Sequence, residues 1–123
     1  MNVIDSSAWL EFVAGTSVGG RFAKVIEKTQ DLIVPSITIY EVFKKVLIER
    51  GEDLALTIIA HMRLGKVIDL DADLALRAAE LSAQRKLPMA DSIVLATAQA
   101  HRATLWTLDR DFKGMDGVRY FAK

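Results

Sequence analysis

Short apolar runs alternate along the chain with longer segments in which apolar residues recur every three or four positions. A short apolar run bounded by turn residues is typical of a buried strand, and the longer repeat is typical of an amphipathic helix. The predicted strands lie at residues 2–4, 32–34, 67–70 and 104–108, with a fifth strand, at an edge, over 118–121.

Each predicted helix combines an apolar stripe with residues suited to its ends. The residues expected at helix starts are Ser7, Thr16 or Ser17, Ser36, Asp71 or Asp73, and Pro88. Gly51 interrupts the third helix, and Gly65 closes the next one. The stripes expected to face the core are Trp9, Leu10 and Val13; Phe22, Val25 and Ile26; Ile39, Phe43 and Val46; Leu54, Ile58 and Met62; and Leu74, Ala78 and Leu81.

The alternation of strands and helices predicts an α/β fold, a three-layer α/β/α sandwich around a mostly parallel sheet of four to five strands. A chain of 123 residues fits one domain over residues 1–123. Ligand sites in such folds lie beyond the carboxyl ends of the strands. The residues that follow each strand are therefore the first candidates for function.

Composition and charge exclude only a few classes of function and site. The chain has no cysteine, which excludes disulfides and thiolate metal sites and fits a reducing cytoplasm. We expect neither a signal peptide nor a membrane span, because the sequence has no basic leader and no apolar run of sufficient length. The 16 Lys and Arg residues balance 16 Asp and Glu residues. Because a metal would neutralise a group of acids, this balance neither supports nor excludes a nucleic-acid substrate.

Four acidic residues stand where such a fold places ligand-binding groups. Asp5 follows the first predicted strand, and Glu41 lies in the first turns of the helix after the second strand. Asp91 opens the last helix, within PMADSIVLATAQA. Asp109 follows the strand at 104–108, and Asp111 comes two residues later.

Each acid alone has a simpler structural explanation. An acid in a first helical turn, such as Asp91, is stabilised by the helix macrodipole by about 0.3–1 kcal/mol. Glu41 has lysines at i+3 and i+4, and Asp109 has Lys113 at i+4, so ordinary surface ion pairs are available. Asp5 can cap the helix that follows it.

Taken together, the acids favour a metal site. Converging carboxylates repel one another, and no lysine or arginine lies within four residues of Asp5 or Asp91. A set of oxygen ligands fits Mg²⁺ or Mn²⁺ rather than zinc. Such ions can activate a water for attack on a phosphodiester, without help from a histidine. The two histidines, His61 and His101, are expected on helix surfaces.

Four segments resemble the motifs of PIN-domain ribonucleases, in particular the VapC toxins of bacterial and archaeal toxin–antitoxin pairs. They are VIDSSAWLEF at 3–12, PSITIYEV at 35–42, KLPMADSIVLATA at 86–98 and TLDRDF at 107–112. The resemblance extends over essentially the whole chain. It implies a metal-dependent endoribonuclease of the prokaryotic cytoplasm that uses Mg²⁺ or Mn²⁺ and a metal-activated water. It also implies a homodimer and a small VapB-like antitoxin that covers the site.

The same resemblance implies roles for individual residues. Ser6 matches the hydroxyl residue after the first acid, Thr107 would hold neighbouring loops by its hydroxyl, and Asp111 would assist through water. One departure is His101 and Arg102, which stand where the family often has a glycine, so a left-handed helix end is less favourable. The matched catalytic acids and metal ligands, whose separate roles stay open, are Asp5, Glu41, Asp91 and Asp109.

Arg110 and Lys113 are the best candidates for contacting an RNA backbone, because they closely follow the fourth acid. Two alternative functions remain open. One is a catalytically weak protein that acts mainly by binding an antitoxin peptide, which the presence of all four acids disfavours. The other is a phosphohydrolase or phospho-receiver of similar topology. A haloacid-dehalogenase-like enzyme would need an acid two residues after Asp5, where this chain has Ser7.

Overall fold

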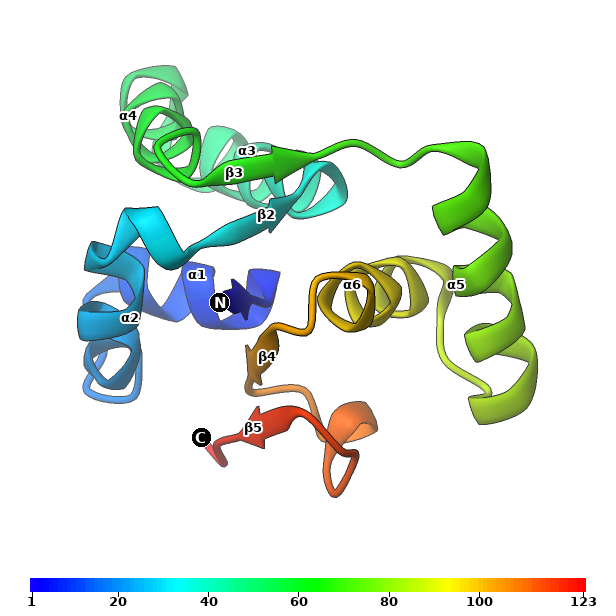
Figure 1. The fold of residues 1–123 in the computed structure, drawn as a ribbon. Helices are drawn as coiled ribbons and strands as arrows, with labels where there is room; N and C mark the ends of the chain where they lie inside the picture. Colours follow the sequence, from blue (N-terminus) through cyan, green and yellow to red (C-terminus); the bar gives the residue numbers. More distant parts are fainter.

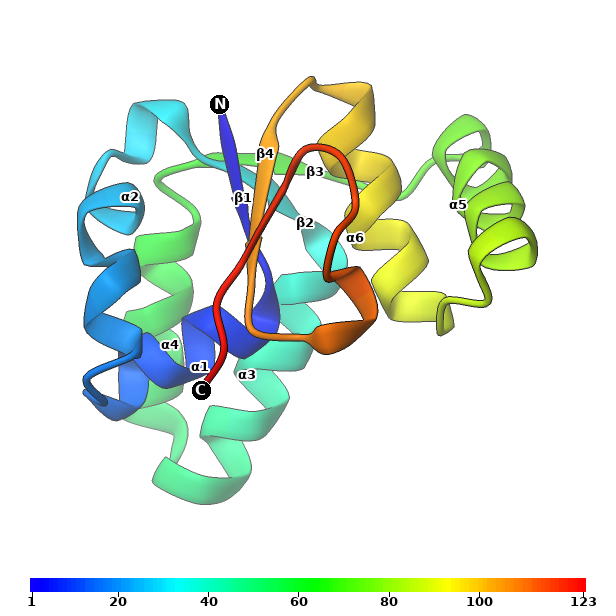
Figure 2. The same cartoon turned by 90° about the horizontal axis from the view of Figure 1, so that it is seen from below.

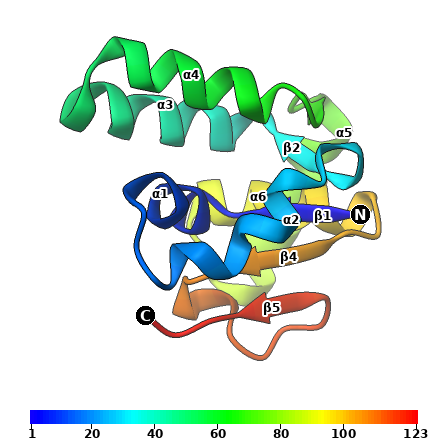
Figure 3. The ribbon, with the colours of Figure 1, turned by 90° about the vertical axis from the view of Figure 1, so that its left-hand side faces the viewer.

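Five parallel strands form the centre of the computed structural model, which describes residues 1–123. Strands β1, β4 and β5 pair in that order, and β2 pairs with β3. A parallel bridge between Asn2 and Leu32 joins the two groups. Figure 3 shows β1, β4 and β5 lying one below another. The strands are β1 (Asn2–Ile4), β2 (Ile33–Pro35), β3 (Lys66–Ile68), β4 (Thr104–Thr107) and β5 (Val118–Tyr120).

Helices cover both faces of these strands, which confirms the three-layer α/β/α sandwich. In Figure 1, α1, α2 and α4 lie to the left of the strands, α5 and α6 lie to the right, and α3 passes behind β2 and β3. No helix combines the length and the hydrophobicity that crossing a bilayer requires. The helices are α1 (Ser6–Ala14), α2 (Ala23–Glu27), α3 (Ser36–Arg50), α4 (Glu52–Met62), α5 (Ala72–Arg85) and α6 (Met89–Ala100), with short 3₁₀ helices η1 (Gly19–Phe22), η2 (Thr29–Asp31) and η3 (Arg110–Phe112).

Two hydrophobic clusters hold the layers together, one on each face of the strands. Val3 and Leu105 point into the cluster formed with α5 and α6. Ile4 and Val34 point into the other cluster, formed with α1 to α4. Because neighbouring residues of a strand face opposite sides, each central strand contributes to both clusters. This double burial fixes the register of β1 against β4, on which the geometry of the site depends.

Helix α5 follows the sequence prediction closely. The carboxylate of Asp71 accepts a hydrogen bond of 2.8 Å from the N–H of Leu74, as expected of a helix cap. The predicted stripe of Leu74, Ala78 and Leu81 is buried. Pro88 precedes α6 directly, one residue earlier than its predicted place inside the first turn.

Two other predicted caps are wrong. Helix α1 begins at Ser6, so Ser7 lies inside the helix, and its hydroxyl binds Asp5 instead of a free helix N–H. Ser36 is also inside its helix, because β2 continues to Pro35 and α3 begins directly after it. The hydroxyl of Thr38 donates to the Pro35 carbonyl at 2.6 Å.

The face that α3 buries also differs from the prediction. Thr38, Val42 and Val46 are its buried residues, whereas Ile39 and Phe43 are only half-buried. Apolar residues occur around most of this helix, so their spacing alone does not select one face.

Arg102 takes the left-handed position after α6 where the family often has a glycine. It adopts a left-handed conformation, with φ of 51°. The turn still closes, because the N–H of Ala103 donates to the Ala98 carbonyl at 2.9 Å. The chain therefore enters β4 in register, at the cost of an unfavourable arginine conformation.

Replacing Gly19 with alanine should destabilise the protein by about 1–3 kcal/mol. A Cβ atom at Gly19 would overlap the backbone of Glu11 in α1, whereas a Cβ at Gly20 would meet nothing. Chemical denaturation of the Gly19→Ala and Gly20→Ala variants measures the difference. Equal stabilities of the two variants would contradict the close approach of η1 to α1.

Candidate metal centre

The fold brings the four predicted acids to the carboxyl ends of the strands. Asp5 follows β1 directly, and Asp109 comes two residues after β4, which pairs with β1 in parallel. Figure 2 shows these two strands running side by side toward the start of α1 and the turn that follows β4. Glu41 lies in the second turn of α3, and Asp91 in the first turn of α6.

Three carboxylates approach one another most closely. Asp91, Asp109 and Asp111 each offer an oxygen within 4.8 Å of the other two. Asp109 also shapes the turn, because its Oδ1 accepts a hydrogen bond of 2.9 Å from the N–H of Asp111. Asp111, predicted only as a supporting residue, therefore belongs to the closest group.

Asp5 is the buried member of the site, with 3% of its surface exposed. Its Oδ2 accepts hydrogen bonds from the Thr107 hydroxyl at 2.8 Å and the Ser7 hydroxyl at 2.9 Å. Burial raises the pKa of the Asp5 carboxyl, and the negative charge of Asp109 adds to this effect. The two hydroxyls and the N–H of Ser6 act in the opposite direction, because they stabilise the ionised form.

Glu41 extends the site on the α3 side. It is half-buried, and burial raises the pKa of its carboxyl, with a smaller contribution from the charge of Asp5. Contact with the Ser6 hydroxyl lowers the same pKa. Ser6 thus acts on Glu41 through its side chain and on Asp5 through its backbone. Glu41 is not part of the three-carboxylate group around Asp109.

None of these acids has a cationic partner. The two salt bridges of the structure join Lys45 to Glu49 and Lys123 to Glu11. The ion pairs that would have given Glu41 and Asp109 purely structural roles do not form. The ammonium groups of Lys44 and Lys113 instead lie over tyrosine rings, each 5.7 Å from the ring centre.

The excess of negative charge at the site has its largest effect on the pKa of Asp91. Burial, followed by the charges of Asp109 and Asp5, raises the pKa of Asp91 to about 7. An isolated acid in a first helical turn would be shifted the other way by the macrodipole. A group of oxygen ligands with excess negative charge fits a hard divalent cation such as Mg²⁺ or Mn²⁺.

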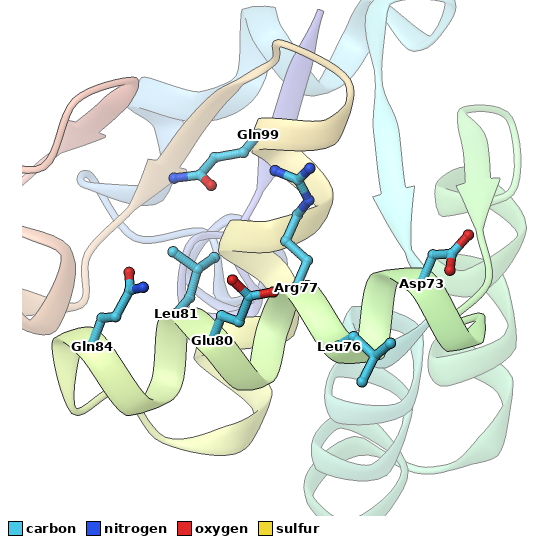
Figure 4. Close-up of a pocket in the computed structure, with 7 residues that line it drawn as sticks. All are labelled: Asp73, Leu76, Arg77, Glu80, Leu81, Gln84 and Gln99. Atoms are coloured by element: carbon cyan, nitrogen blue, oxygen red, sulfur yellow. The ribbon is translucent and has the colours of Figure 1, made fainter.

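One hollow of the surface borders this site and another lies away from it. Ser6 and Glu41 line a hollow of about 340 Å³ together with Tyr40, Lys45 and Ile48. Figure 4 shows a different, polar hollow along α5. Its lining residues, Asp73, Leu76, Arg77, Glu80, Leu81, Gln84 and Gln99, include none of the four acids.

The rings of the two histidines contact backbone carbonyls. One ring nitrogen of His61 lies 3.3 Å from the Ile26 carbonyl, and one of His101 lies 3.0 Å from the Thr97 carbonyl. Ser7, in contrast, is a site residue that the sequence analysis missed. The signal available in the sequence was its position two residues after Asp5. Ser7 was instead interpreted as a helix cap.

Comparison with known proteins gives a consistent family assignment. The family model described as PIN domain matches residues 3–118. No curated protein sequence matches the chain.

Solved structures with the same fold include several toxins. A toxin–antitoxin complex from Klebsiella pneumoniae contains a chain that is 26% identical, with a TM-score of 0.85 and full coverage of both chains. VapC20 of Mycobacterium tuberculosis, described as a sarcin–ricin loop cleaving toxin, is 19% identical with a TM-score of 0.78, covering 94% of this chain and 95% of its own. VapBC2 from Rickettsia felis, bound to a DNA fragment from their promoter, is 15% identical with a TM-score of 0.73, covering 98% and 97%.

Proposed function

Since the chain belongs to the PIN domain family, we propose that it is a metal-dependent endoribonuclease and the toxin of a toxin–antitoxin pair. The observation that carries the proposal is the convergence of Asp5, Asp91, Asp109 and Asp111 without a basic partner. The ionised carboxylates of such a site repel one another unless a cation binds between them. The 26% identical chain in a toxin–antitoxin complex supports the same class of function.

We assign the cation to Asp5, Glu41, Asp91 and Asp109, with Asp111 beside them. When bound, Mg²⁺ or Mn²⁺ lowers the pKa of water and neutralises charge that develops on a phosphodiester. The chain supplies a fixed set of oxygens for this purpose. Thr107 holds the loop after β4 against Asp5, since its hydroxyl donates to Asp5 and accepts from the N–H of Asp109 at 2.9 Å.

The proposed partners are an RNA substrate, a VapB-like antitoxin and a second copy of the chain. The hollow beside Glu41 gives the antitoxin a place to bind. Two apolar side chains on its wall are largely exposed, Tyr40 at 60% and Ile48 at 74%. An apolar segment seated there would cover the acids from the α3 side. We place this activity in a single nuclease domain, residues 1–123, in the prokaryotic cytoplasm.

Cleavage of RNA by the purified protein tests the proposal. Total RNA should be cut when Mn²⁺ or Mg²⁺ is present and should stay intact with a chelator, and mapping the ends gives the cut sites. Binding of an antitoxin peptide without any cleavage would instead favour the weakly catalytic alternative. Hydrolysis of small phosphate esters but not of RNA would favour a phosphohydrolase.

Arg110→Ala should weaken RNA binding and reduce the slope of log affinity against log salt by about one. Arg110 is exposed in η3, directly after Asp109, so its charge can reach a phosphate at the site. Lys66→Ala is the matched control, because Lys66 is exposed at the amino end of β3, away from the carboxyl ends of the strands. Filter binding of single-stranded RNA over a salt series measures both slopes. Identical slopes for the two variants would remove Arg110 from the RNA-binding surface.

A further inference from the structure

The two hydroxyl groups that bind the Asp5 carboxylate both contact the same oxygen. Oδ2 accepts from the Ser7 hydroxyl at 2.9 Å and from the Thr107 hydroxyl at 2.8 Å. Each hydroxyl also accepts a backbone N–H from the loop after β4. The N–H of Leu108 donates to Ser7 at 3.2 Å, and the N–H of Asp109 donates to Thr107 at 2.9 Å.

These bonds imply the direction of the two hydroxyl protons. A hydroxyl has one proton to donate, and the backbone N–H groups occupy an acceptor position on each hydroxyl oxygen. Both hydroxyl protons therefore point at Asp5, as an ionised carboxylate requires. No side chain donates to Oδ1. This oxygen consequently keeps a lone pair for a cation, while Oδ2 is used to hold the side chain.

We infer that Ser7 is a positioning residue of the metal centre, acting through Asp5. It fixes the Asp5 side chain so that Oδ1 is presented to the cation, and it ties the loop that carries Asp109 to the same carboxylate. The inference rests on the proposed metal-dependent function. The family resemblance matches Ser6 and Thr107 and gives no role to Ser7.

A purely structural role for Ser7 explains these contacts less well. Ser7 lies in the first turn of α1, yet it caps no helical N–H, because its proton goes to Asp5 and its oxygen accepts from Leu108, 101 residues away in sequence. Bonds of this kind around metal ligands orient the ligand, and losing one typically lowers metal affinity about 10–100-fold.

Mn²⁺ binding to the full-length protein, measured by electron paramagnetic resonance of the free ion, tests the inference without RNA. Ser7→Ala should weaken Mn²⁺ binding about 10–100-fold. Ser7→Thr keeps the hydroxyl and should bind within about threefold of the unaltered protein. Thr57→Ala is the control, because it removes an exposed hydroxyl whose bond to the Asp53 carbonyl stays within α4. Circular dichroism reports whether each variant is folded.

The outcomes separate this inference from the proposed function. Unchanged Mn²⁺ affinity in folded Ser7→Ala would overturn the role of Ser7 and leave the metal centre intact. Equal losses in Ser7→Ala and Ser7→Thr would also overturn it, since the hydroxyl would not be the group that matters. Absence of Mn²⁺ binding to the unaltered protein would overturn the proposed metal centre itself. Rescue by threonine, with no change in Thr57→Ala, is the result we expect.

Discussion

Asp91→Asn should lower the rate of RNA cleavage by at least about 100-fold while the metal-free protein stays folded. Asparagine has nearly the shape of aspartate but no charge, so it removes a cation ligand without creating a cavity. Burial, together with the negative charges of Asp109 and Asp5, raises the pKa of Asp91 to about 7 and disfavours its ionised form. At pH 8 the substitution therefore removes an unfavourable charge, and the metal-free variant should be at least as stable as the unaltered protein. Cleavage rates with saturating Mn²⁺ and thermal unfolding with a chelator measure the two effects.

Asp53→Asn provides the matched control. Asp53 stands in the first turn of α4 as Asp91 stands in the first turn of α6. If Asp91 only stabilised its helix macrodipole, both substitutions would lower stability slightly and leave cleavage unchanged. Wild-type cleavage rates in Asp91→Asn would show that the site is wrongly assigned.

The metal-free protein should lose stability as pH rises from 5 to 8, and a divalent cation should restore it mainly at the higher pH. The pKa of Asp91 is about 7 in the folded chain, against a usual value of 3.8. Between these values the folded state holds a proton that the unfolded state has released, so the free energy of unfolding falls with rising pH. Burial raises the pKa of Asp5 and Glu41 as well, which adds to the same trend.

The cation competes with these protons, so its effect has the opposite pH dependence. At pH 8, Mn²⁺ at 100 times its dissociation constant should add about 2.7 kcal/mol to the free energy of unfolding. At pH 5 the same concentration should add much less. Thermal unfolding at both pH values, with Mn²⁺ or with a chelator, measures the difference, and Asp91→Asn should reduce it. Equal stabilisation by Mn²⁺ at both pH values would contradict proton-linked binding at these acids.

Local sequence signals predict most of the fold because several independent signals indicate the same element. In α5, a capping aspartate and a regular apolar stripe indicate the same helix and the same buried face, and both are confirmed. In α3 the signals diverge. Apolar residues surround the helix, and only packing against α4 and the strands selects Thr38, Val42 and Val46 for burial.

The candidate site was predictable in outline but not in detail. Parallel strands place their carboxyl ends at one edge, so the convergence of Asp5 and Asp109 follows from strand order alone. The absence of ion pairs at Glu41 and Asp109 could not be predicted from the sequence, because lysines that could pair with them lie nearby in the chain. Nor could spacing decide between two neighbouring serines, because only the folded loop after β4 brings an N–H to Ser7.

The pairing of β1 with β4 joins the two ends of the chain, and this has a consequence for synthesis. Asn2 pairs with Thr104, so synthesis must pass residue 109 before Asp5 can meet Asp109. A nascent or truncated chain that stops before residue 104 lacks β4, β5 and two of the clustered carboxylates. The complete set of acids therefore cannot assemble until the segment that carries Asp109 and Asp111 has been made.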